Sequence, residues 1–210
     1  MAKRSYLITL LLIPVFVLSG CKYNTPEGYS EKHHPYEELV EYAKSIDPDA
    51  TVTDDPETVN ELYREFKIYP AVIKGVNCSV ASASRSVYDS TWGEFAKTFY
   101  RMDTDYDYYI IRDVVAKYPI LGVICDDSVT HRFHLNDIVY TEITADSLTE
   151  QDLDTIFEEY TKCCKELEGY DLRKSFWCDI SVGDNKYRFK EPTSEDKQKT
   201  IDRMRSNGDL

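Results

Sequence analysis

The sequence has little of what several common enzyme classes need. Among 210 residues there are only 8 glycines and 4 histidines. It contains no GxGxxG or P-loop to cradle phosphates, no GxSxG turn around a nucleophilic serine, and no HExxH pair for zinc. The familiar motifs of nucleotide-binding proteins, serine hydrolases and zinc proteases therefore have no counterpart in this chain.

Basic residues are also scarce. Lysine and arginine number 25 against 38 aspartates and glutamates, which gives a net charge of −13. Proteins that bind DNA or RNA gain affinity by placing basic side chains on phosphates and releasing counterions, so no nucleic-acid partner is expected. Over the whole chain, a partner that is basic, neutral or a cation fits this charge better than an anionic one.

Long hydrophobic runs are absent except for one near the N-terminus, which spans 13 residues from Tyr6 to Leu18. A helix of this length rises about 20 Å, which is too short to cross a hydrocarbon core of about 30 Å. Lys3 and Arg4 precede the run, and Ser19 and Gly20 follow it. A short basic segment, an apolar segment and small residues together predict an export signal.

The end of this segment, Leu18-Ser19-Gly20-Cys21, resembles the lipobox of bacterial lipoprotein signal peptides. The resemblance covers residues 1–21 and implies cleavage before Cys21, with a diacylglycerol thioether on the cysteine. Residues 1–20 would then be a signal peptide and residues 21–33 a lipid-anchored tether. Two or more acyl chains such as palmitate hold a protein stably in a membrane. The expected location is the extracytoplasmic face of the cell membrane, or the outer membrane if the source has one.

With Cys21 assigned to lipid, an odd number of cysteines remains, so one chain cannot pair them all. They are Cys78, Cys125, Cys163, Cys164 and Cys178. None has the spacing of a zinc site. Buried free thiols are favoured, and one or two disulfides are the alternative, because an exported protein meets oxidising conditions unless its source is anaerobic.

Hydrophobic periodicity predicts an α+β fold: a single domain with an antiparallel or mixed sheet packed by amphipathic helices, over residues 34–190. Helical patterns occupy residues 35–46, 55–66, 91–100 and 148–167, and strand patterns occupy residues 71–80, 120–125, 138–143 and 176–189. Residues 106–118 fit either type. Residues 191–210 read as a polar tail that forms a loosely packed helix.

Alternate carboxylates at Asp103, Asp105 and Asp107 form the first candidate site. Such a run can converge on Ca²⁺, which prefers six to eight oxygen ligands. An EF-hand loop would next require glycine and then a distal glutamate, where this chain has Tyr108 and Val114. A looser Ca²⁺ site stays open, and the favoured interpretation is an acidic turn that begins the next helix.

A second candidate combines His131 and His134 with Asp126 and Asp127. On a helix the two histidines would share a face, whereas on a strand they would point to opposite faces. The surrounding apolar residues favour a strand, so exposed hairpin histidines are preferred over a zinc or acid–base site.

Aromatic residues are numerous, with 17 tyrosines and 2 tryptophans, and could supply a face for sugars or peptides. Most of them, including Phe99, Tyr160 and Trp177, fall at positions expected to pack in the core. The favoured hypothesis is a non-enzymatic, membrane-anchored lipoprotein that binds an unknown protein or small molecule, without a cofactor other than a possible Ca²⁺. The alternative is a lipid-anchored hydrolase or metal-dependent enzyme that uses the acidic and histidine clusters.

Overall fold

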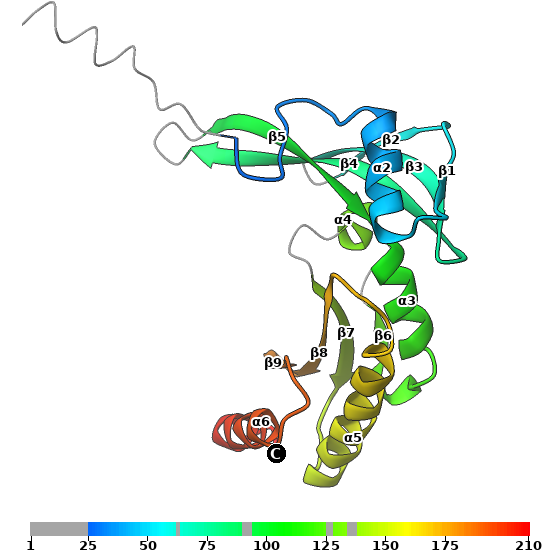
Figure 1. Ribbon diagram of the computed structural model, residues 1–210. Helices are drawn as coiled ribbons and strands as arrows, with labels where there is room; N and C mark the ends of the chain where they lie inside the picture. The colour runs from blue at the N-terminus through cyan, green and yellow to red at the C-terminus, as the bar shows by residue number, and fades with distance from the viewer. Residues whose placement is uncertain (1–24, 62–63, 90–93, 125–127, 134–137) are drawn as a thin grey trace, which may run out of the picture.

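The computed structural model describes residues 25–61, 64–89, 94–124, 128–133 and 138–210 (Figure 1). Its first part contains α2 (Tyr36–Ile46), β1 (Thr51–Val52), β2 (Glu57–Glu61), β3 (Arg64–Ile73), β4 (Val76–Asp89) and β5 (Glu94–Thr104). Its second part contains α3 (Tyr106–Val115), the 3₁₀ turn η1 (Pro119–Leu121), β6 (Val123–Ile124), α4 (Val129–Arg132), β7 (Ile138–Ala145), α5 (Glu150–Leu167), β8 (Ser175–Val182), β9 (Asn185–Phe189) and α6 (Ser194–Asn207).

The N-terminal lobe, residues 25–104, is built on an antiparallel sheet in the order β1-β3-β4-β5, with β2 pairing to the other part of β3. Lys74 and Gly75 both have positive φ and close the β3–β4 hairpin, as the glycine predicts. Helix α2 lies across one face of the sheet and buries Leu39 and Ala43 against it. Its periodic apolar positions and the Asp47-Pro48 stop explain why it forms and where it ends.

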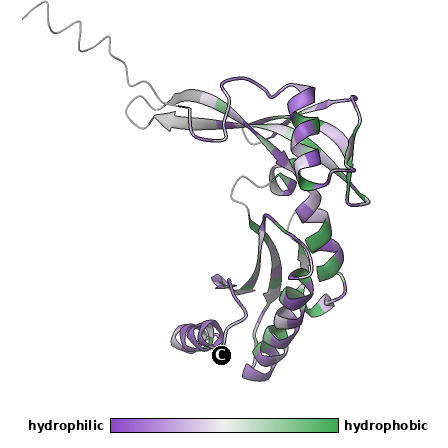
Figure 2. Cartoon of the chain, viewed as in Figure 1, coloured by the Kyte–Doolittle hydropathy of each residue, from purple (hydrophilic) through white to green (hydrophobic). Residues whose placement is uncertain are grey.

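The C-terminal lobe, residues 106–124 and 138–210, holds a mixed sheet in the order β6-β7-β8-β9. Helix α4, between these two ranges, packs against the N-terminal sheet, where Phe133 is buried beside Phe66. β7 and β8 are parallel neighbours joined by α5, and β8 and β9 form an antiparallel hairpin around Gly183. Ile111 of α3, Tyr160 of α5 and Met204 of α6 are buried in one core together with the inward side chains of the sheet. Figure 2 shows that most residues of α5 and α6 are hydrophilic, with hydrophobic residues between them.

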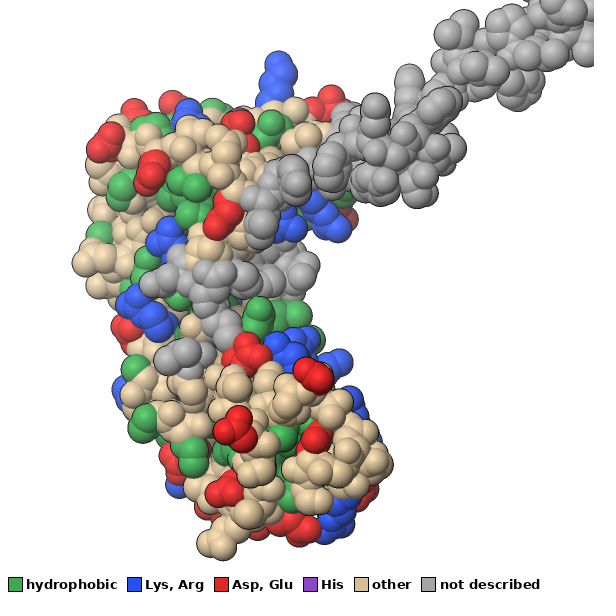
Figure 3. Space-filling view, turned by 180° about the vertical axis from the view of Figure 1, so that it is seen from behind, with side chains coloured by type: hydrophobic (Ala, Val, Ile, Leu, Met, Phe, Trp, Pro, Cys, Tyr) green, Lys and Arg blue, Asp and Glu red, His purple; other side chains and the backbone are tan. Residues whose placement is uncertain are grey.

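Helix α3 connects the two lobes. Tyr106, in its first turn, is buried in the core beneath α2, while Ile111 is buried in the core of the C-terminal lobe. Seen from behind, the molecule is hollowed on one side between the lobes (Figure 3). Within the ranges that the structure describes, no helix has the length and apolar character needed to cross a membrane.

The α+β class, with antiparallel and mixed sheets packed by amphipathic helices, is confirmed. The residues form two sheets, each with its own helices. The helices predicted over residues 35–46 and 148–167 are present as α2 and α5, and the ambiguous residues 106–118 contain helix α3. The tail forms helix α6, as predicted, but the helix is not loosely packed, because Ile201 and Met204 are buried in the core.

Two predicted helices are wrong. Of residues 55–66, Glu57–Glu61 form β2 and β3 begins at Arg64, while of residues 91–100, residues 94–100 belong to β5. In both cases the helical spacing of the apolar residues loses to sheet pairing, with β3 and β5 both paired to the long strand β4. Tertiary context overrides local propensity here because pairing satisfies the backbone N–H and C=O groups of each strand and buries side chains such as Phe66 and Phe99.

Candidate functional site

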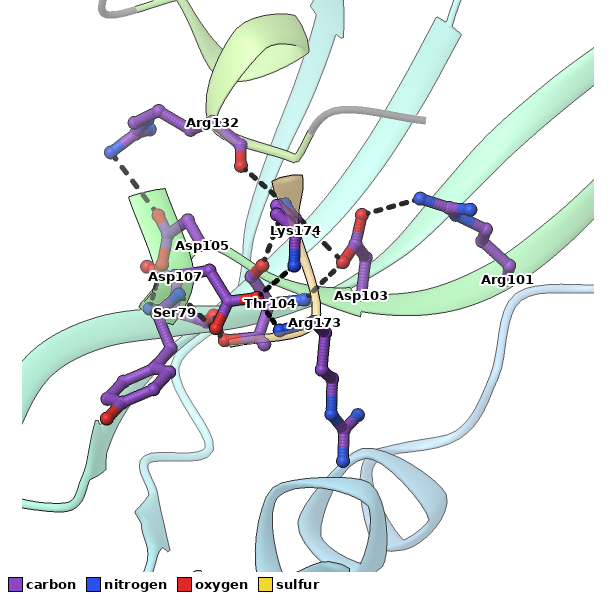
Figure 4. Close-up of polar contacts among 10 residues, drawn as sticks. Ser79, Arg101, Asp103, Thr104, Asp105, Asp107, Arg132, Arg173 and Lys174 are labelled. Atoms are coloured by element: carbon purple, nitrogen blue, oxygen red, sulfur yellow. Dashed lines mark hydrogen bonds and ion pairs between the residues drawn. The ribbon is translucent and has the colours of Figure 1, made fainter. Parts of the chain in front are cut away.

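The acidic run lies where β5 passes into α3, at the junction of the two lobes (Figure 4). Asp103 is the last acidic residue of β5 and is almost completely buried. Arg101 Nη2 donates to its Oδ2 at 3.0 Å, and Lys174 Nζ lies 3.7 Å from its Oδ1. The backbone N–H of Thr104 also donates to Oδ1 at 2.8 Å. The Asp103 carboxylate is therefore neutralised by two cations that come from different lobes.

Asp105 precedes α3 and is fully buried. Its Oδ1 accepts the backbone N–H of Ser79 at 2.5 Å, which ties the start of the helix to β4. Its Oδ2 lies 3.7 Å from Arg132 Nη1 and accepts no hydrogen bond from the described residues. Burial raises the pKa of Asp105 to about 6, against the opposing effects of the Ser79 N–H and the Arg132 and Lys174 charges.

Asp107 turns toward the C-terminal lobe. Its Oδ2 accepts the backbone N–H groups of Arg173 and Lys174 at 2.7 and 2.8 Å. Burial raises its pKa, and these two N–H groups act in the opposite direction. The buried Lys174 ammonium donates to the backbone oxygens of Thr104 at 3.1 Å and Arg132 at 2.9 Å. Asp107 and Lys174 thus join the start of β8 to the chain around α3.

The three carboxylates do not converge on one point (Figure 4). Lys174 is a partner of two of them, through its ammonium group to Asp103 and through its backbone N–H to Asp107. Within the described ranges, no three histidine, cysteine, aspartate or glutamate side chains are grouped so as to hold a metal ion. A cavity of about 120 Å³ beside the junction is lined by Tyr42, Asp103 and Arg173 among others. It is smaller than the roughly 300–1,000 Å³ of typical ligand pockets. The geometry makes this run a joint between elements.

The other predicted site residues are placed only in part. Cys21, Asp126, Asp127 and His134 lie outside the described residues. His131 lies in the short helix α4, so the strand predicted around it is wrong, and its side chain is not described.

The described cysteines are free, namely Cys78, Cys163, Cys164 and Cys178. Burial raises the pKa of the Cys78 and Cys163 thiols to about 12 and that of Cys164 to about 11, and it raises that of Cys178 as well. Thiols react as thiolates, so these groups are poor nucleophiles at neutral pH. Cys125 lies outside the described residues.

The face of the C-terminal sheet opposite its helices carries Trp177, a residue expected to pack in the core. Phe176, Cys178 and Ile180 of β8 point into the helix-covered core, so Trp177 points to the opposite face. Trp177 is only half-buried, which corrects its expected place in the core, whereas Phe99 and Tyr160 are buried as expected. The alternation of apolar residues at positions 176, 178 and 180 already indicates that Trp177 points to the outer face.

The outer face also carries cations. Tyr187 and Phe189 of β9 are buried, so Lys186, Arg188 and Lys190 are exposed on the side of Trp177. We call the surface formed by Tyr140, Trp177, Lys186, Arg188 and Lys190 the aromatic–basic face.

A scan against protein-family models and searches of the curated proteins and of the solved structures find no match.

Proposed function

We propose that this protein is a bacterial lipoprotein, anchored through Cys21 on the extracytoplasmic side of a membrane, whose folded part is a non-enzymatic binding module. The observation that carries the proposal is the register of Leu18-Ser19-Gly20-Cys21 directly after the 13-residue apolar segment. The binding role draws support from the aromatic–basic face, an exposed sheet surface with two aromatic rings and three cations.

Lipidation is tested by growing bacteria that express the full chain with a fatty-acid analogue. The wild-type protein should carry the label, and Cys21→Ala should not, because the thioether needs that sulfur. Cys164→Ala is the matched control and should be labelled like the wild type. Equal labelling of the wild type and Cys21→Ala would refute the lipoprotein assignment.

The alternative, a metal-dependent hydrolase centred on Asp103, Asp105 and Asp107, loses support because these carboxylates already hold cations and N–H groups. An ion at a hundred times its Kd stabilises a protein by about 2.7 kcal/mol, which would shift the melting temperature by several degrees. We expect millimolar Ca²⁺ to shift it no more than Mg²⁺ does. A Ca²⁺-selective rise that Asp105→Ala abolishes would favour the metal-dependent enzyme.

A further inference from the structure

The aromatic–basic face is the side of the C-terminal sheet that α3, α5 and α6 leave open. Tyr140 of β7 and Trp177 of β8 are direct partners in the parallel register, so their rings stand side by side on neighbouring strands. Both side chains are half-buried, and the cations of β9 and the residue after it continue the same surface.

Rings and cations alternate closely on this face. The Arg188 guanidinium lies 5.0 Å from the Trp177 ring centre and 5.8 Å from that of Tyr140. Lys186 Nζ is 5.8 Å from the Tyr140 ring, and Lys190 Nζ is 5.2 Å from the Trp177 ring. Because cations occupy the negative ring faces, the groups left for a partner are cationic heads and the electropositive ring edges. Both favour a negatively charged partner.

The balance of charge on the face is positive toward solvent. Asp179 is fully buried and holds Arg188 through two hydrogen bonds, at 2.5 and 2.7 Å. Lys186 lies 3.2 Å from Glu142 and 3.3 Å from Asp179. In the described part of the chain, no carboxylate lies within ion-pair distance of Lys190. Asp179 thus fixes the Arg188 side chain in place from below. Among the described residues, the carboxylates paired with these cations are Asp179 and Glu142, so three cations face two carboxylates, of which only Glu142 is partly exposed.

We propose that this face docks an acidic polypeptide segment in which apolar side chains separate the carboxylates. Carboxylates would meet Lys190, Lys186 and the outward part of Arg188, while apolar side chains would contact the edges of Trp177 and Tyr140. The proposal deepens the binding role proposed above. The net charge of −13 favours a basic or neutral partner for the chain as a whole, whereas this face favours an acidic one.

A short segment fits this surface better than an extended polyanion or an anionic bilayer. Residues 161–210, which form most of the face, carry 11 basic and 10 acidic residues, whereas the chain as a whole is strongly acidic. Charges interact over a Debye length of about 8–10 Å at physiological salt. A partner confined to the face therefore meets its cations, and one that extends beyond it meets the acidic remainder of the protein.

The test uses the full chain in detergent and a fluorescein-labelled random copolymer of glutamate and tyrosine, with binding measured by fluorescence anisotropy. The wild type should bind, and Lys190→Glu should weaken binding at least tenfold because it places a carboxylate beside the partner's own. Lys165→Glu makes the same charge change on α5, on the helix-covered side, and should change the affinity less than twofold. In a Trp92→Phe background, the copolymer should also change the emission of Trp177.

Equal weakening by Lys190→Glu and Lys165→Glu would show non-specific attraction and overturn the proposal. If phosphatidylglycerol vesicles or inorganic phosphate displaced the copolymer, and their binding also depended on Lys190, the proposal would be overturned. The face would then be a site for lipid headgroups or phosphate. Fatty-acid labelling of Cys21 is independent of these outcomes. A labelled protein that fails to bind the copolymer would refute this docking surface and leave the lipoprotein assignment standing.

Discussion

The three buried carboxylates at the lobe junction do not affect stability in the same way. Asp107 and Asp103 are compensated by N–H groups and cations, whereas Asp105 keeps one oxygen that accepts no hydrogen bond from the described residues. A buried carboxylate in this situation favours its protonated form. The sequence marks these residues by their alternation, but it does not show which of them lies beside a cation from another element.

The raised pKa of Asp105 predicts a pH-dependent stability. An unfolded aspartate has a pKa of about 3.9, whereas that of folded Asp105 is about 6. Between these values unfolding releases a proton, so the Asp105 contribution to the free energy of unfolding falls as pH rises. Asp105→Asn removes the titrating carboxyl group and still offers Oδ1 to the Ser79 N–H. Relative to the wild type, the variant should gain about 2 kcal/mol between about pH 4.5 and pH 7.5 in urea unfolding.

Asp113→Asn is the control for this experiment. Asp113 is on the exposed side of α3, with 69% of its side chain accessible. Its difference from the wild type should stay flat over the same pH range. A flat difference for Asp105→Asn as well would contradict the buried, raised-pKa carboxylate.

At the scale of whole elements, the sequence predicts best where a pattern and its end signals agree. Helix α5 was placed within two residues because its apolar stripe is long and a capping pair stands at its start. In the structure Thr149 and Asp152 form the capping box of this helix. The β8–β9 and β3–β4 hairpins fall within the predicted strand regions 176–189 and 71–80, where a glycine with positive φ, Gly183 or Gly75, stands between the paired strands.

The β2–β3 hairpin shows why other elements could not be predicted. Val59 and Phe66 are paired across it, yet their spacing with Leu62 and Tyr63 also fits one helical face. The two residues between Glu61 and Arg64 are Leu62 and Tyr63, so the glycine or asparagine that usually marks a tight turn is missing. The pairing of β3 with β4 decides the matter, and that contact is not local in the sequence.

Gly122 links η1 to the C-terminal sheet and predicts a sharp local sensitivity. It has φ +79° and ψ −153°, and an added Cβ would lie 2.3 Å from the backbone oxygen of Glu142 in β7. Gly122→Ala should therefore push β6 away from β7 and cost about 3 kcal/mol or more, measured by urea unfolding. Gly75→Ala, with φ +76° but open space around its Cβ, should cost only about 1 kcal/mol. Equal losses would mean that the contact with Glu142 contributes nothing.

On the scale of the whole molecule, the chain forms two sheets, and a shared set of residues connects them. Phe133, which follows α4, is buried against the N-terminal sheet. Tyr109 and Ile110 of α3 pack against the cores of both lobes. Lys174, from the C-terminal lobe, is bonded to Thr104 at the end of the N-terminal sheet and to Arg132 in α4. Unfolding either lobe alone would expose half of α3 and strip partners from a buried ammonium group.

We therefore expect a form lacking residues 1–21 to unfold in one cooperative transition. In a Trp92→Phe background, Trp177 fluorescence reports the C-terminal lobe and far-UV circular dichroism reports both lobes, so the two urea curves should coincide. Lys174→Ala leaves buried acceptors without their donor and should lower the free energy of unfolding by about 2–4 kcal/mol. It should shift both curves together, whereas Lys165→Ala, exposed on α5, should shift neither. If Lys174→Ala moved the fluorescence curve alone, the lobes would be independent folding units, and the junction would hold together domains that are already stable.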